Sequence, residues 1–328
     1  MNFIVPFSPA NLPAKIQHSD KIMLVGSCFT EHIGVKMSKV KMQILQNPNG
    51  ISFNPLSIAE TLKACIVGHQ NKEADLFSLN ELWHNWQFHS RFSNTDKVLA
   101  LADMNQSLLQ GSQFIQQANW LIISFGSAFQ YFLKQNDVPE IGVANCHKAP
   151  GDWFEKRMIS IEEIVAKWRV LIVELRNVNP SLNLLFTVSP VKHLKDGVVE
   201  NSRSKAILIE AVRQLESTFE HCHYFPAYEI VQDVLRDYRF YDKDLAHPNE
   251  QAVDYIWSQF LKACIEEKDH ELIKKIEEIM QGLQHRPRFP DTVANKKFKF
   301  ALSEKINKLT CSIPYLDFAK ELAALTAN

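Results

Sequence analysis

The 328-residue sequence contains little glycine and no closely paired cysteines. Only 10 residues are glycine, which leaves no room for a GxGxxG motif or a Walker phosphate-binding loop. The six cysteines are scattered without a CxxC pair, a pattern typical of reduced thiols rather than of a zinc site. These absences argue against nucleotide chemistry of those kinds and against a metal centre. We expect neither a metal nor a cofactor.

The sequence also lacks an excess of one charge and a long apolar run. Its 36 basic residues nearly balance 37 acidic ones, whereas a dedicated nucleic-acid binder normally carries a basic excess. The most apolar stretches, such as Trp120–Phe125 and Leu182–Val188, are far shorter than the ~20 residues of a membrane span. The N-terminal segment has no secretory-signal pattern. We therefore expect a cytoplasmic protein with no nucleic-acid partner and no membrane span; its oligomeric state is left open.

Short apolar runs alternate with long amphipathic segments, which is typical of an α/β fold. The predicted strands are Lys21–Gly26, Lys41–Gln46, Asn119–Gly126, Asn183–Ser189 and His223–Pro226. The predicted helices are Ser27–Val40, Pro55–Val67, Ser160–Val178, Ser202–Phe219 and one that Pro248 opens and that runs through Trp257 and beyond. Ser160 and Glu163 form a capping-box pattern at the start of one helix. The alternation predicts a three-layer sandwich around a mostly parallel central sheet.

Two segments interrupt this alternation, and the C-terminal part differs from the rest. Leu79–Ser93 is rich in aromatic residues and histidine, and Phe129–Cys146 has strand-like ends around the turn residues Asn136–Gly142. We expect both to be insertions at strand ends, where an open α/β sheet binds its ligand. Helical periodicity resumes in Asp269–Gln284 and Lys296–Asn328. The expected domains are an α/β domain over residues 1–262 and a helical extension over 263–328.

A serine and an Asp–His pair are the strongest candidates for chemistry. Ser27 follows the first strand and begins a helix, where backbone N–H groups can stabilise an oxyanion. Taken alone, Ser27 is better explained as a helix N-cap, because serine is common at that position. Asp244 lies three residues before His247, so its carboxylate can orient one ring nitrogen and leave the other facing a nucleophile. Together these residues indicate a serine nucleophile with a histidine base.

Gly26-Ser27-Cys28-Phe29 resembles the signature from which the GSCFA family takes its name, a bacterial group similar to the SGNH (GDSL-like) hydrolases. The resemblance covers roughly residues 1–262 and is carried by several further segments: Asn47–Ile58, Leu82–Ser93, Leu121–Tyr131, Asn145–Lys148, Thr187–Gly197 and Asp237–Pro248. It implies an SGNH-hydrolase-like fold. It also implies that Ser27, Asp244 and His247 are the catalytic residues.

The same resemblance implies an oxyanion hole and shows one departure from the pattern of these hydrolases. Gly50, after the second strand, is the best match for the glycine that supplies an N–H group. The third block of these hydrolases is Gly-x-Asn-Asp; Gly126 is present here, but Ser127 and Ala128 follow it. The expected asparagine is therefore missing. Asn145 and the Ser127 hydroxyl are the candidates to replace it.

Four further histidines lie in the family-like segments: His84, His89, His147 and His193. They are candidates for substrate binding, and equally for hydrogen-bonded histidines that brace loops. Arg91 is a candidate for holding an anionic group of a substrate, or for pairing with a surface carboxylate. Metal binding is less favoured, because the spacing of these histidines is not that of a ligand set.

Cys28 is a rival nucleophile, because a cysteine at a helix N-terminus can have a lowered pKa. Adjacent side chains do not share a helix face, however, so Ser27 and Cys28 cannot both face His247. The resemblance favours Ser27.

We therefore expect a serine esterase that acts through an acyl-enzyme on a small-molecule ester, with carbohydrate acyl esters as the example implied by the resemblance. Two alternatives remain open: an acyltransferase with the same triad, and a non-catalytic binding protein on the same scaffold. A basic surplus between His285 and Lys308, seven basic residues against two acidic, would suit an acidic partner. A solvated helix face explains it more simply.

Overall fold

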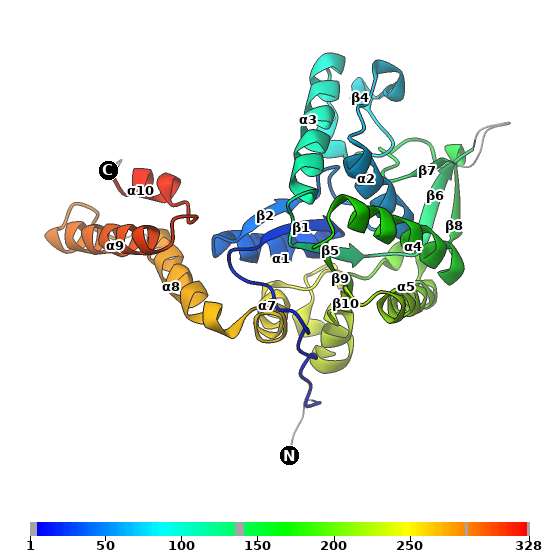
Figure 1. Cartoon of the computed structure of the whole chain (residues 1–328). Coiled ribbons are helices and arrows are strands. Elements are labelled where there is room, and N and C mark those ends of the chain that lie inside the picture. Colours follow the sequence, from blue (N-terminus) through cyan, green and yellow to red (C-terminus); the bar gives the residue numbers. More distant parts are fainter. Residues whose placement is uncertain (1–4, 135–140, 286–287, 327–328) are drawn as a thin grey trace.

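A five-stranded parallel sheet lies at the centre of the molecule (Figure 1). The computed structural model describes residues 5–134, 141–285 and 288–326. The strands run in the order β10-β9-β5-β1-β2, and every neighbouring pair is parallel. Their bounds are β1 Lys21–Gly26, β2 Gln43–Gln46, β5 Trp120–Phe125, β9 Asn183–Val188 and β10 Cys222–Tyr224. The structure thus confirms the predicted α/β class and parallel sheet.

The order of the strands places a crevice between β1 and β5. From β1 the chain moves outward to β2, and it then returns to the other side of β1 to form β5, β9 and β10. The connections therefore diverge at β1 and β5, whose carboxyl ends lie side by side. Such a point of divergence is where open α/β sheets bind their ligands.

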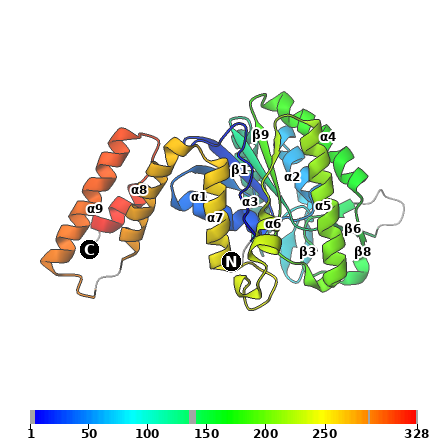
Figure 2. The ribbon, with the colours of Figure 1, turned by 90° about the horizontal axis from the view of Figure 1, so that it is seen from below.

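Helices cover both faces of the sheet, because successive strand side chains point to opposite faces. In β1, Met23 and Val25 belong to one buried core, and Ile22 and Leu24 belong to the other. Figure 2 shows α2, α4 and α5 on one side of the sheet and α1 and α7 on the other. The bounds of the covering helices are α1 Cys28–Lys39, α2 Pro55–Val67, α3 Lys97–Ile115, α4 Ile161–Val178, α5 Val198–Thr218 and α7 Glu250–Cys264.

The segments between β2 and α4 contain the additions to this three-layer frame. The expected insertion near 79–93 includes β4 (Leu82–His84), paired with β3 (Phe77–Leu79), and a short 3-10 helix at Ser90–Phe92. A small sheet follows β5: β6 (Phe129–Leu133) pairs with β7 (Ile141–Val143) and with β8 (Phe154–Met158). Of the predicted turn over 136–142, residues 136–140 lie outside the described ranges.

Several element predictions need correction. The sequence analysis assigned no helix to α3, although its buried residues repeat at helical spacing: Ala100, Met104, Leu108, Gly111 and Ile115. Helix α5 begins at Val198 rather than at Ser202. Pro248 precedes α7, whose N-cap is Asn249. The last predicted helix is divided into two, with a break at Ile313–Phe318.

The C-terminal helices pack beside α1 and α7. They are α8 (Glu267–Gln284), α9 (Val293–Ser312) and α10 (Ala319–Thr326). Ile276 and Ile306 are fully buried in the same core as the side chains of α1 and α7. Lys41, just before β2, pairs with Glu321 at 2.6 Å. Within the described ranges, every helix is too short or too polar to cross a membrane.

Candidate functional site

Ser27 lies where β1 ends and α1 begins. Gly26 before it has φ +136°, and a Cβ there would lie 2.3 Å from the Ser124 carbonyl oxygen, so only glycine fits. Ser27 is the N-cap of α1 and its Oγ accepts the Phe29 N–H at 3.3 Å, as its N-cap interpretation predicted. The same Oγ lies 2.9 Å from Ser124 Oγ on the neighbouring strand β5. Ser27 is 3% exposed, so its hydroxyl is held between the ends of β1 and β5.

Asp244 and His247 form a pair on the loop before α7. His247 Nδ1 donates to Asp244 Oδ2 at 2.5 Å. The other carboxylate oxygen, Oδ1, accepts the N–H groups of Ala246 and His247, and these bonds lower the pKa of Asp244 to about 2. The carboxylate is thus ionised at neutral pH. A proton on Nδ1 leaves Nε2 of His247 able to act as a base.

This pair lies close to α1, the helix that follows β1, and to the loop that follows β9. Lys192, after β9, donates its N–H to Ala246 O at 3.0 Å. The positive charge of His247 contributes to lowering the pKa of both His32, on α1, and His193, after β9; burial is the larger cause in both. Within the described part of the chain, Ser27 and His247 share no direct hydrogen bond; Ser27 Oγ bonds Ser124 and Phe29 instead.

The loop after β2 forms two hydrogen bonds with the backbone of Gly26. Asn47 Oδ1 accepts the Gly26 N–H at 2.8 Å, and Ser52 donates its N–H to Gly26 O at 3.1 Å. Among the described residues, Asn47 Nδ2 and Ser52 Oγ find no hydrogen-bond partner, although both atoms are buried. Buried polar groups normally have partners, so these two mark a place where a ligand atom could bind. Within this loop the sequence predicted a site role for Gly50, and not for Asn47 or Ser52.

Gly50, Gly126 and Asn145 are the oxyanion candidates. The backbone N–H group of each already donates a hydrogen bond. Gly50 donates to Asn47 O at 2.7 Å, and Gly126 donates to Phe53 O at 2.7 Å. Asn145 donates its N–H to Trp86 O at 3.2 Å, and its side-chain oxygen accepts from the backbone N–H of His147. The N–H of Cys28 differs, because it is the first residue of α1 and has no acceptor within the helix.

Two of the four histidines brace the insertion. His84 contacts Ser93 Oγ at 2.7 Å through Nδ1 and Leu79 O at 3.1 Å through Nε2. The His147 ring lies 4.4 Å from that of His84 and contacts Asn85 O at 2.9 Å. Burial lowers the pKa of His147 to about 4. Both rings lie in an aromatic cluster with Phe77 rather than beside Ser27.

The other two histidines lie against the glycines of the strand-end loops. A Cβ at Gly50 would lie 2.2 Å from His89 Cβ, and one at Gly126 would lie 3.3 Å from His193 Nε2. Burial, with a smaller effect of the positive charge of Lys205, lowers the pKa of His193 to about 4. His193 is therefore neutral at pH 7, and its ring has one N–H donor.

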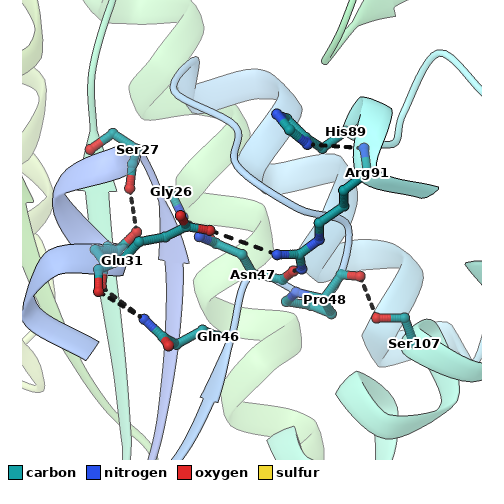
Figure 3. A network of polar contacts seen from close by, with 10 residues as sticks. Gly26, Ser27, Glu31, Gln46, Asn47, Pro48, His89, Arg91 and Ser107 are labelled. Atoms are coloured by element: carbon teal, nitrogen blue, oxygen red, sulfur yellow. Dashed lines mark hydrogen bonds and ion pairs between the residues drawn. The ribbon is translucent and has the colours of Figure 1, made fainter. Parts of the chain in front are cut away.

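Arg91 joins the insertion to the loop after β2 and to α1. One guanidinium nitrogen donates to Asn47 O at 2.5 Å, and another lies 3.7 Å from Glu31. Figure 3 shows this bridge beside the Gly26–Ser27 turn, with His89 on the same short 3-10 helix segment as Arg91. Pairing with a surface carboxylate, one of its two predicted roles, is thus present.

The remaining candidate groups give no second reaction centre. Burial and the negative charge of Glu31 raise the pKa of Cys28, which opposes the lowered value expected of a reactive thiol. Among the residues that the structure describes, no three His, Cys, Asp or Glu side chains converge as metal ligands. A cavity of about 670 Å³ lies between α2, the insertion and β6. Most of its amide groups bond one another or the backbone, as Asn85 does with Asn71, whereas Asn49 Oδ1 is buried and has no partner among the described residues.

The fold and these residues define a doubly wound α/β protein with a serine at the point of divergence and an Asp–His pair on a neighbouring loop. The GSCFA family model matches residues 21–260, and a second model, the C-terminal domain of GSCFA domain proteins, matches residues 276–328. The chain belongs to the GSCFA family. No curated protein matches it.

Solved structures with a similar outline include three esterases. A carbohydrate esterase family 3 protein from Talaromyces cellulolyticus has 11% identity and a TM-score of 0.36 over 78% of this chain and 98% of that one. A Clostridium thermocellum family 3 carbohydrate esterase has 8% identity and a TM-score of 0.34, over 79% and 99%. The acetyl xylan esterase Est2A from Butyrivibrio proteoclasticus has 12% identity and a TM-score of 0.39, over 77% and 64%.

Proposed function

We propose that this GSCFA protein is a serine esterase in which Ser27 is the nucleophile, His247 the base and Asp244 the residue that orients His247. The observation that carries the proposal is the bond from His247 Nδ1 to an ionised Asp244, on a loop that is hydrogen-bonded to the segment after β9, in the same sheet whose strand β1 ends at Ser27. A free Nε2 on such a histidine is what a serine hydroxyl needs as proton acceptor.

In the proposed reaction, Ser27 Oγ turns from Ser124 towards His247 and attacks the acyl carbonyl while His247 takes its proton. The proton then passes to the leaving alcohol, and an acyl-Ser27 ester remains. Water, deprotonated by His247, hydrolyses this ester and restores the serine. Asp244 stays ionised throughout and stabilises the imidazolium.

For the oxyanion we propose donors other than the two glycines, whose N–H groups are engaged. The Cys28 N–H at the start of α1 is one, since a helix N-terminus favours negative charge. The buried and unpartnered Asn47 Nδ2 beside Gly26 is the other. His89 and His193 are the proposed substrate contacts. A small acyl ester of an alcohol or a carbohydrate is the proposed substrate class, from the hydrolases that the family resembles.

One observation favours a second function, a binding protein without catalysis. Ser27 Oγ bonds Ser124 rather than His247, and Gly50 and Gly126 both use their N–H groups internally. A ligand-binding site needs no contact between a nucleophile and a base.

Acyl transfer uses the same steps as hydrolysis, with an alcohol in place of water. Product analysis with an added alcohol therefore distinguishes acyl transfer from hydrolysis.

The test is labelling with a fluorophosphonate probe, followed by peptide mapping and by assays with short-chain nitrophenyl esters. We expect an adduct on Ser27, its loss in Ser27→Ala and a labelling rate reduced by at least about 100-fold in His247→Ala. Ser202→Ala, which removes an exposed serine of α5, is the matched control and keeps the adduct. No adduct and no ester hydrolysis in the wild type would support the binding protein instead.

A further inference from the structure

Helix α5 presents three buried polar side chains towards the strand-end loops. Asn201, Ser204 and Lys205 are 6%, 2% and 1% exposed. Their spacing of three and four residues places them on one face of the helix. Burying polar groups costs free energy unless each finds a hydrogen-bond partner. The contacts of these three side chains therefore explain why this face of α5 is polar.

Each side chain binds backbone at the end of β5 or β9. Ser204 Oγ accepts the Ala128 N–H at 2.7 Å, after β5. Asn201 Oδ1 accepts the His193 N–H at 2.8 Å, after β9. Lys205 binds both loops: its Nζ donates to Gly126 O and to Ser189 O, each at 2.6 Å. The lysine thus ties together the two loops that carry Gly126 and His193.

Lys205 is buried without an opposite charge. Its two hydrogen-bond acceptors are backbone carbonyls, and no ion pair to a carboxylate exists within the described residues. Burial lowers the pKa of Lys205 to about 7. Its ammonium group is costly to bury, and the hydrogen bonds to the two carbonyl oxygens offset part of that cost.

We propose that Lys205, with Asn201 and Ser204, positions the strand-end loops of the candidate site, and that it places His193 against Gly126 for substrate binding. The expected effect of Lys205 on catalysis rests on the proposed esterase function. The placement of His193 does not depend on that function. None of the three touches the reacting atoms in the proposed reaction. They are positioning residues.

The test compares Lys205→Met with the wild type in three measurements: thermal stability, the rate of probe labelling at Ser27, and the titration of His193 followed by NMR. We expect a lower melting temperature because Gly126 O and Ser189 O lose their donor, labelling slower by about 10- to 100-fold because the loops shift, and a His193 pKa that rises towards its ordinary value. Asp196, His247 and Lys156 also face His193 and remain in the variant. Ser202→Ala, on the exposed face of the same helix, is the control.

A folded Lys205→Met with unchanged labelling and unchanged His193 titration would overturn the proposal. If the wild type is not labelled at all, the esterase function fails, and the His193 titration in Asn201→Ala, which keeps the charge of Lys205, decides whether this face of α5 positions His193. If Lys205→Met does not fold, Ser204→Ala gives the same comparison, because it leaves the Ala128 N–H unpaired while Lys205 remains. Loss of stability in Ser204→Ala without slower labelling or a changed His193 signal would also overturn the proposal.

Discussion

At the scale of single residues, the backbone of Gly26 determines where the side chain of Ser27 lies. The positive φ of Gly26 turns the chain as β1 ends, and its missing Cβ lets the backbone lie against Ser124. The turn places Ser27 at the N-terminus of α1, with its hydroxyl between two strands. Ser27 is 3% exposed, so a nucleophilic role requires that substrate binding displaces its bonds to Ser124 and Phe29. The two roles predicted for Ser27 are thus compatible.

The buried histidines predict a pH dependence of stability. His147 has a pKa of about 4 in the folded protein and an ordinary value near 6.5 when unfolded. Between these values the unfolded chain binds a proton that the folded chain does not, so stability falls as the pH drops from 6.5 to 4. We expect His147→Gln to make this fall smaller in urea unfolding measured across that range. The exposed His69→Gln is the control, and equal slopes for wild type and His147→Gln would contradict the assignment.

At the scale of elements, helix α4 was predicted from its ends as well as from its periodicity. Ser160 Oγ accepts the Glu163 N–H, and Glu163 accepts the Ser160 N–H, so the predicted capping box is confirmed. A cap depends only on residues three apart, which is why the sequence shows it directly. Helix α3 also has a local cap, since the Asp96 side chain accepts the N–H groups of Val98 and Leu99, and the helix packs against α2.

Removal of the cap gives a prediction for this element. Ser160→Ala leaves the Glu163 N–H without its acceptor, and we expect the free energy of unfolding to fall by about 1 kcal/mol. Chemical denaturation measures the change. Ser217→Ala, an exposed serine in the last turn of α5, should change stability by less than about 0.5 kcal/mol. A loss in Ser160→Ala no greater than in Ser217→Ala would show that the box does not stabilise α4.

At the scale of the whole molecule, the C-terminal helices share a core with the sheet. Side chains of α8 and α9 are buried together with those of α1 and α7, and Tyr315 bonds His18 at 2.9 Å. A chain divided at residue 262 would expose this shared surface. We propose that the extension, predicted as a separate domain over 263–328, unfolds together with the α/β domain.

A pair of substitutions on α9 tests this cooperation. Ile306 is fully buried, and Ile306→Ala should lower the free energy of unfolding by about 2–5 kcal/mol in a single transition. Phe300 on the same helix is 68% exposed, and Phe300→Ala should change it by less than about 0.5 kcal/mol. Tryptophan fluorescence and far-UV circular dichroism should report one midpoint. A separate early transition of the helices in Ile306→Ala would show that the extension folds on its own.

The sequence by itself determined the α/β class, the five parallel strands, the Ser27 turn and the Asp244–His247 pair, because each depends on local periodicity or on residues a few positions apart. Tertiary structure alone decided which distant groups meet. His84 and His147 lie together in one cluster, whereas His89 and His193 lie against Gly50 and Gly126. The backbone N–H groups of these two glycines donate hydrogen bonds within the protein, and Lys205 is buried between two loops. These outcomes depend on how strands far apart in the chain are ordered and how their loops pack, and no local pattern encodes that.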